Sequence, residues 1–331
     1  DLSFVVHYQA PNSVVSYYQQ VGRAGRATDA YGVLLSGSEE REIHEYFRNS
    51  AFPTRDEVRK VLEALDESDL GLSSRQLLGV VNLRQSRLEK TLQLLSLESP
   101  APIVKDGYKW RLTASTLTEV FWERAARLTA LREIEEQELQ SYVDLTDGHM
   151  KFLVDALDGD SSAILGSNKP ELALELDSEI VQDALIFLNR TGRPILPRKK
   201  WPDGGMALIE QTGFITKEEQ NEEGVALCAW GDAGWGRLVK DGKYDHGHFS
   251  DELVSESAKL IRELPIQPEW VCWIPSLRRR DLVSEFAERL AKELGVEVVD
   301  ALRTTRSHPE QKEMQNWVQQ GRNVDGVFEI S

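Results

Sequence analysis

The chain has 331 residues, of which 40% are hydrophobic, and this is enough to fill two or three soluble domains. No stretch reaches the roughly 18 unbroken apolar residues of a membrane span, and no signal peptide is visible, so we expect a cytoplasmic protein without a membrane partner. Two cysteines, Cys228 and Cys272, exclude a four-cysteine zinc site and a disulfide framework.

The net charge of −16 is unusual for a protein that binds nucleic acid, but the charge is unevenly distributed. Residues 116–190 carry 16 acidic and 6 basic side chains, whereas residues 51–115 carry 10 basic and 9 acidic ones. Phosphate binding depends on local basic patches rather than on the total charge. Nucleic-acid binding therefore remains open, but not through residues 116–190.

The N-terminal segment combines a short strand, a capped helix and a motif of glycines and arginines. Residues 3–8 have the pattern of a buried strand, and the turn at 11–13 can cap a helix that starts near Val14. The helix leads into Gln-Gln-Val-Gly-Arg-Ala-Gly-Arg at 19–26. Guanidinium groups make paired, charge-assisted hydrogen bonds to phosphate oxygens, and the glycines let the backbone come close. The motif indicates a grip for polyphosphate; the alternative is a surface loop of accidental composition.

This motif, with Ser-Tyr-Tyr-Gln at 16–19, resembles the sixth conserved motif of superfamily 2 helicases, and within them the RecQ family. The resemblance implies that residues 1–53 are the C-terminal part of a second RecA-like lobe. It also implies an ATP-binding loop with two catalytic arginines. In this loop Arg26 would be the arginine finger for the γ-phosphate, Arg23 its neighbour, and Gln19 and Gly22 further contacts to the nucleotide.

A RecA-like ATPase also needs a G-x-x-x-x-G-K-[ST] loop and an acidic pair for magnesium, and neither occurs in the chain. We expect ATP and Mg²⁺ to be held mainly by a missing N-terminal RecA-like lobe. The chain would then be a fragment of a longer protein that does not hydrolyse ATP alone.

Residues 54–115 follow the pattern of a winged helix. Thr54 and Glu57 predict a capping box for a first helix, a second helix starts at Ser73 or Ser74, and a third spans 85–97. Residues 103–112 alternate around an Asp-Gly turn, which predicts a hairpin.

The third helix and the hairpin gather basic side chains with two aromatic rings, which indicates a DNA-binding face. Packing of the two rings on the third helix, or contact with a protein, remains the alternative. In RecQ relatives the winged helix engages duplex DNA at its junction with a single strand, which makes DNA the expected partner. The predicted DNA-binding residues are Arg84, Arg87, Lys90, Lys105, Tyr108, Lys109, Trp110 and Arg111.

Residues 116–169 are predicted to be a helical region. A long helix over 117–143 would act as a strut packed along one domain, and a short helix follows at 150–158. RecQ relatives place a cysteine cluster for zinc after such a helix, but 159–169 contains no cysteine, so zinc is unlikely and this segment is the expected linker. The apolar stripe of the long helix comprises Phe121, Ala125, Leu128, Leu131, Ile134 and Leu139.

Residues 170–331 are predicted to hold a linker and a partial parallel α/β domain. A strand at 270–276, a helix at 282–294 and a strand at 296–299 have the βαβ rhythm. With the basic run at 278–280 and the segments 309–311 and 322–328, this part resembles a ComF-type phosphoribosyltransferase domain. The resemblance implies a pyrophosphate loop; an exposed charged turn is the alternative. Its candidate residues are Ser276, Arg278, Arg279 and Arg280, and the family's phosphoribosyl pyrophosphate loop would follow only after Ser331.

The expected fold class is therefore multidomain, α/β plus α+β: the end of a RecA-like lobe, a winged helix, a helical linker region and a partial phosphoribosyltransferase-like domain. The RecQ resemblance implies the C-terminal portion of an ATP-dependent helicase that unwinds DNA from 3′ to 5′ in repair or recombination. Two alternatives are a non-catalytic DNA- or protein-binding adaptor, and a phosphoribosyltransferase targeted to DNA.

Overall fold

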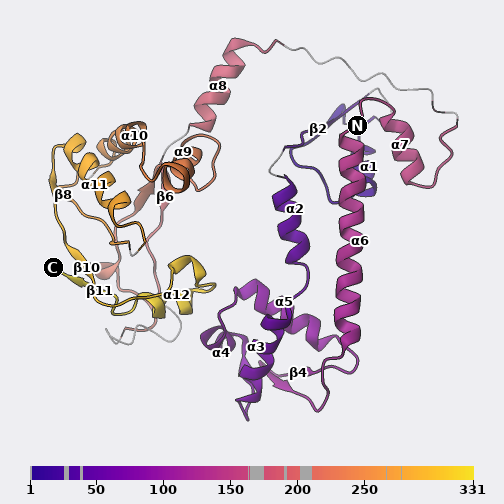
Figure 1. Ribbon diagram of the computed structural model, residues 1–331, viewed down its shortest axis with the longest axis horizontal. Helices are drawn as coiled ribbons and strands as arrows, with labels where there is room; N and C mark the ends of the chain where they lie inside the picture. The colour runs from indigo at the N-terminus through magenta and orange to yellow at the C-terminus, as the bar shows by residue number, and fades with distance from the viewer. Residues whose placement is uncertain are drawn as a thin grey trace. The chain divides into compact units, whose positions relative to one another are not determined.

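The computed structural model describes residues 2–25, 30–37, 40–162, 164, 175–189, 192–201, 211–265, 267–276 and 278–331. In these ranges the chain forms twelve α-helices and several small sheets (Figure 1). It divides into two compact units, residues 1–74 with 86–172, and residues 75–85 with 173–331. The structure thus confirms a mixture of α and β elements in more than one unit.

The first unit opens with a parallel βαβ arrangement. Strands β1 (Phe4–His7) and β2 (Tyr31–Leu34) pair in parallel, and helix α1 (Val14–Val21) connects them. The α1 helix starts where the sequence predicts because Oγ of Ser13 accepts a hydrogen bond from a free amide of its first turn. Helix α2 (Glu40–Asn49) follows β2.

Next in this unit come a helix, a short strand, a second helix and a hairpin. These are α3 (Arg55–Asp66), β3 (Leu72–Ser73), α5 (Gln85–Ser96), β4 (Ile103–Asp106) and β5 (Lys109–Leu112). The three strands form one antiparallel sheet in the order β3-β5-β4.

Local signals set the ends of these elements. The capping box before α3 is formed, since N of Glu57 donates to Oγ1 of Thr54 (3.2 Å) and N of Thr54 donates to Oε2 of Glu57 (2.6 Å). Between β4 and β5, Gly107 has a φ of +60°, a conformation that glycine adopts readily. The predicted capping box and hairpin are therefore confirmed.

The long helix α6 (Glu119–Val143) and the short helix α7 (His149–Ala156) complete the first unit. In Figure 1, α6 runs from the group around α3 and α5 to the group around α1 and α7. Phe121 is only 1% exposed and Leu139 2%, but Leu131 is 49% and Ile134 61% exposed. The expectation that the whole apolar stripe packs along a domain is wrong for the middle of the helix, because the apolar side chains there are exposed.

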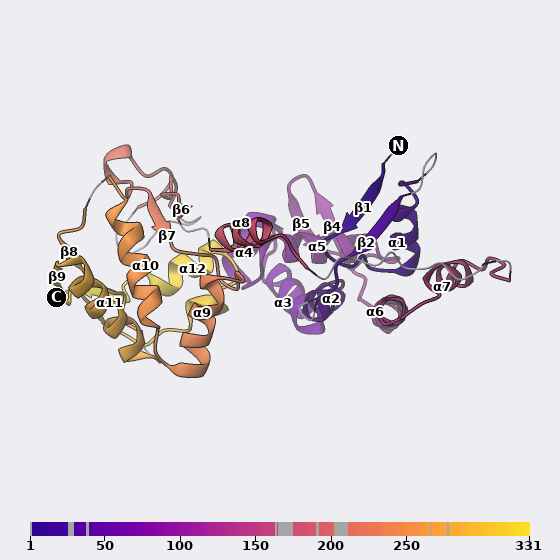
Figure 2. The ribbon, with the colours of Figure 1, turned by 90° about the horizontal axis from the view of Figure 1, so that it is seen from above.

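The second unit contains a second parallel βαβ arrangement. Strand β8 (Trp270–Val271) pairs in parallel with β9 (Glu297–Val298), and α11 (Arg280–Leu294) connects them, which confirms the predicted rhythm. Helix α10 (Asp251–Arg262) lies beside α11 (Figure 2). The remaining elements are α4 (Ser74–Val80), α8 (Ser178–Leu188), β6 (Arg193–Ile195), β7 (Gly224–Ala226), α9 (Trp235–Asp241), β10 (Leu302–Thr304), α12 (Trp317–Val324) and β11 (Phe328–Ile330).

Candidate functional site

The glycine and arginine turn directly follows α1. N of Gly22 donates to O of Tyr18 (2.8 Å), which closes the last turn of the helix. Gly25 has a φ of +73°, in the region that favours glycine, and its N donates to O of Leu2 (3.1 Å). The turn is thus held against the chain that leads into β1.

Three predicted site residues of this turn, Gln19, Gly22 and Arg23, are exposed. Among the described residues, none forms a hydrogen bond or an ion pair with the Arg23 side chain. Arg26, the predicted arginine finger, lies outside the described residues. An exposed guanidinium without an internal partner can bind an anion supplied by another molecule or lobe.

Three aromatic or amide side chains behind the turn hold α1 in place, and the sequence reasoning gave none of them a role. His7, at the end of β1, is 8% exposed, and its Nε2 lies 2.9 Å from Oε1 of Gln20. The His7 ring also lies 5.0 Å from the ring of Tyr17, centroid to centroid. Gln20, although exposed like Gln19, is therefore held by a residue of the strand.

Tyr17 continues this contact towards α6. Its ring lies 5.1 Å from the ring of Tyr142, and both belong to a buried cluster with Val14, Leu139 and Leu153. Burial, together with a hydrogen bond to Tyr17, raises the pKa of the Tyr142 hydroxyl. Nothing in the sequence pattern links these two tyrosines, because they come from segments far apart in the chain.

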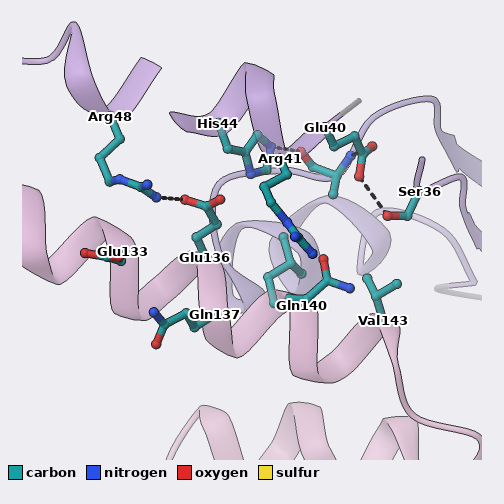
Figure 3. Close-up of a pocket in the computed structure, with 12 residues that line it drawn as sticks. Ser36, Glu40, Arg41, His44, Arg48, Glu133, Glu136, Gln137, Gln140 and Val143 are labelled. Carbon is teal, nitrogen blue, oxygen red and sulfur yellow. Dashed lines mark hydrogen bonds and ion pairs between the residues drawn. The ribbon is translucent and has the colours of Figure 1, made fainter. Parts of the chain in front are cut away.

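A pocket of about 310 Å³ lies between α2 and α6 (Figure 3). Glu40 accepts hydrogen bonds from N of Ala10 (2.7 Å) and from Oγ of Ser36 (2.8 Å), and Arg48 forms an ion pair with Glu136. Figure 3 shows Arg41 extending from α2 towards α6. Arg48 and Glu136 therefore neutralise each other, and both bonds of Glu40 go to groups of its own unit. We interpret the pocket as a polar gap between two helices rather than a catalytic centre.

The β4–β5 hairpin presents cations and one ring to solvent. Tyr108, next to the turn, is 74% exposed, and Lys105 is exposed as well. Arg111 is exposed but forms an ion pair with Asp106 (3.3 Å), and Nζ of Lys109 donates to a backbone carbonyl (3.4 Å). The hairpin thus keeps four of the predicted DNA-binding residues on accessible positions.

Trp110 differs from the other predicted DNA contacts on the hairpin. It is 9% exposed, and its Nε1 donates to Oγ of Ser74 (3.2 Å). Lys105 covers the ring at 5.4 Å. Trp110 is a core residue of the hairpin and is not available to stack on a base, so the expected role for it is corrected to packing.

Arg87 on α5 is also hydrogen-bonded to groups inside the first unit. Its guanidinium donates to both carboxylate oxygens of Glu57 (2.8 and 2.7 Å) and to O of Ser50 (2.5 Å) and Phe52 (2.6 Å), and the side chain is 15% exposed. Burial and hydrogen bonds act on Glu57 in opposite directions, and the bonds from Arg87 and Thr54 win, so the pKa of the Glu57 carboxyl is lowered. Arg87 fixes the segment that joins α2 to α3 and is removed from the DNA-binding set.

Two further predicted DNA contacts have partial internal partners. Lys90 remains exposed, although its Nζ donates to O of Ser50 (3.2 Å). Burial and the nearby Arg87 and Arg132 lower its pKa. Arg84 belongs to the second unit, where its Nε donates to Oε1 of Gln315 (3.2 Å).

The predicted pyrophosphate loop lies between β8 and α11. Oγ of Ser276 accepts a hydrogen bond from N of Arg279 (3.2 Å), Arg278 forms an ion pair with Glu310, and the Arg279 guanidinium lies 5.1 Å from the Tyr244 ring. These residues line a cavity of about 860 Å³. The side chain of Arg280 lies outside what the structure describes. The loop is thus basic, but its two described arginines already have partners.

Glu310 is the acidic centre of that cavity. Its carboxylate also forms an ion pair with Lys312 (2.5 Å). Lys312 and Arg278 together lower the pKa of the Glu310 carboxyl, Lys312 having the larger effect. A bound anion would have to compete with this carboxylate for both cations.

Comparison of the chain with protein-family models, with curated proteins and with solved structures gave no match. In the described part of the chain, no helix combines the length and the apolarity that crossing a membrane requires. The same residues include no group of three or more His, Cys, Asp or Glu side chains arranged to hold a metal ion.

Proposed function

We propose that this chain is the C-terminal portion of a RecQ-like, ATP-dependent DNA helicase that unwinds duplex from 3′ to 5′ in repair or recombination. The observation that carries the proposal is the exposed Arg23, which has no internal partner in the described chain and stands on a turn after the helix of a parallel βαβ arrangement. In such motors an arginine supplied across a cleft stabilises charge on the transferring γ-phosphate. Arg26 and Arg23 would serve this role for ATP and Mg²⁺ held by another lobe.

The β1–β2 sheet supports a larger lobe around this turn. Phe4 is 62% exposed, Val6 50% and Tyr31 59%, although parallel sheets are normally covered on both faces. Exposed apolar side chains on two neighbouring parallel strands favour further strands or helices that pack against them. The proposal assigns that cover to the rest of the RecA-like lobe.

For DNA, the proposal takes residues 54–115 as a winged helix. Within the first unit, the order α3-β3-α5-β4-β5 and the sheet order β3-β5-β4 favour this fold, and α4 lies between β3 and α5 in the sequence. On the wing, Lys105, Lys109 and Arg111 would contact phosphates, and Tyr108 would stack on the base at the duplex junction.

The test is DNA-stimulated ATP hydrolysis by a protein that carries this chain behind a lobe with a phosphate-binding loop. Replacing Arg26 or Arg23 with alanine should abolish most of the turnover and leave DNA binding intact. Arg41→Ala is the matched control, since Arg41 is another exposed arginine of the same unit that the proposal gives no role. Equal turnover in all three variants would refute the motor function and leave the adaptor alternative.

A second candidate function rests on the cavity beside the loop that joins β8 to α11. Ligands of open α/β sheets bind outside the carboxyl ends of the strands, which is where Ser276, Arg278 and Arg279 lie. We propose a pyrophosphate-type ligand for this cavity, as in the phosphoribosyltransferase resemblance. Calorimetric titration of the chain with pyrophosphate tests it, and the absence of binding in both wild type and Glu310→Gln would refute it.

A further inference from the structure

The long helix α6 is anchored at its N-terminal end to the elements that carry the wing. Phe121 is buried, and the Arg124 guanidinium lies 5.7 Å from its ring and pairs with Glu98, just after α5. Arg55 at the start of α3 pairs with Glu119 (2.6 Å) and covers the Trp122 ring at 4.6 Å. These contacts therefore hold the N-terminal end of α6 to the group formed by α3 and α5, so that the two move together.

The C-terminal end of α6 is anchored to the helix that leads into the nucleotide-sensing turn. Leu139 and Tyr142 are buried against Val14 and Tyr17 of α1. From Tyr142 the contact continues through the ring of Tyr17 to His7 and from there to Gln20. Gln20 precedes the exposed Arg23 by three residues, within the same helix end.

Between these anchors lies a span of α6, residues 126–135, that we call the bare span because its side chains are not buried. Arg132 lies near Lys90 of α5, Glu133 borders the pocket next to α2, and the ion pair with α2 is formed by Glu136, just beyond the span. The helix has 25 residues, a length of about 37 Å at 1.5 Å per residue. An uninterrupted α-helix of this length, hydrogen-bonded throughout, transmits a displacement of one end to the other, whereas a flexible linker would absorb it.

We propose that α6 is the mechanical link between the wing and the nucleotide-sensing turn: DNA bound at the wing displaces α1, and with it Gln19, Gln20 and Arg23, through this helix. The inference rests on the proposed motor function and adds a route of regulation to it. Tyr142 acts in it as a positioning residue, which moves α1 through Tyr17 and does not touch nucleotide.

The test softens the bare span without touching either anchor. Ala126 and Ala130 are both exposed, and changing both to glycine raises the flexibility of the span because glycine is a poor helix former. The matched control changes both to glutamine, which keeps the helix. In the ATP-hydrolysing protein the glycine variant should keep its basal turnover and its affinity for DNA but lose at least fivefold of the stimulation by DNA. The glutamine variant should keep all three. Equal stimulation in the two variants would overturn the link.

Hydrogen exchange on the 331-residue chain separates this inference from the proposed function, because it needs neither ATP nor DNA. Arg124→Ala weakens the wing-side anchor, and in the glutamine background the amides of Tyr17–Val21 should then exchange at least threefold faster. In the glycine background the same change should leave these amides unaffected. If they do not respond to Arg124→Ala in either background, the link is refuted, whatever the ATPase measurements show. If they respond only in the glutamine background while Arg23→Ala leaves turnover intact, the link stands and the motor function fails.

Discussion

The arginines beside the two parallel βαβ arrangements differ in whether they have partners inside their own unit. In the first unit, Arg23 follows α1 and stands in solvent without an internal partner among the described residues. In the second unit, Arg278 and Arg279 precede α11 and are engaged with Glu310 and Tyr244. An arginine that reaches an external phosphate must keep its donors free, because each internal partner adds a competitor. The comparison favours the first turn as the site that acts on an anion from outside.

The same contrast separates the predicted DNA contacts. Lys105 and Tyr108 are exposed on the hairpin, whereas the Arg87 guanidinium donates hydrogen bonds to Glu57 and to two backbone carbonyls. Whether a cationic side chain can bind a ligand therefore depends on its exposure and on its internal hydrogen bonds, and not on its charge alone.

The largest expected effect comes from Arg23→Lys, which keeps the charge but removes the forked geometry. If Arg23 contacts ATP, turnover in the ATP-hydrolysing protein should fall by about 10³-fold, or about 4 kcal/mol of transition-state stabilisation. The KM for ATP should change much less. Steady-state kinetics measures turnover and KM. Full activity of Arg23→Lys would mean that a point charge suffices at this position, and it would contradict the distinction drawn between Arg23 and the arginines of the second unit.

Arg87→Ala should lower the free energy of unfolding of the first unit by about 3 kcal/mol, because it leaves the Glu57 carboxylate and two carbonyls without their donor. The control Arg59→Ala removes an exposed arginine from α3, with pairs to Asp56 and Glu63, and should lower the free energy of unfolding much less, because solvent screens exposed pairs. Urea denaturation measures the difference. Similar losses in both variants would mean that the Arg87 contacts are no stronger than surface pairs.

The Arg87 contacts also predict a pH dependence. Because the pKa of Glu57 is lowered in the folded chain, its contribution is complete above the unfolded value and is lost as the pH falls through the folded value. The difference in urea midpoint between wild type and Arg87→Ala, measured from pH 7 down to pH 3, should therefore narrow towards the acidic end, where only the part due to the two backbone carbonyls remains. A constant difference at all pH values would contradict this assignment.

On the wing, Lys105→Ala should reduce the slope of log affinity against log salt by about one unit, since one phosphate contact is lost. Arg111→Ala should reduce it by less, because Asp106 already holds part of the arginine's charge. Binding of a forked duplex at several salt concentrations gives both slopes. Unchanged slopes would assign this face to a protein partner.

The smallest expected effect concerns the second unit. Glu310→Gln removes the carboxylate that competes for Arg278 and Lys312, so affinity for pyrophosphate should rise about threefold. Calorimetry with pyrophosphate measures it, and Glu313→Gln on the same cavity lining is the control. An unchanged affinity would show that these two cations do not serve the ligand.

Much of the local structure could be predicted because its causes lie within a few residues. Ser13, Thr54 with Glu57, the Asp-Gly turn at 106–107 and Gly295 each satisfy or release backbone groups of their own segment. Helix and strand ends at these positions follow from the sequence. The arginine motif was visible for the same reason, as a contiguous pattern.

What the fold decided was the partner of each side chain. The apolar residues of α6 look alike in sequence, yet Phe121 and Leu139 are buried while Leu131 and Ile134 are exposed. Periodicity identifies the face of a helix that could be buried, but not how much of its length meets another element.

The sequence by itself therefore determined the elements and a contiguous pattern of glycines and arginines. Only the tertiary structure decided that Arg87 and Trp110 have partners inside the first unit, that Arg23 has none among the described residues, and that Tyr142 contacts Tyr17. The physical reason is the separation along the chain of the residues involved. Caps and turns are set by neighbouring residues, whereas burial and ion pairing depend on side chains that only folding brings together.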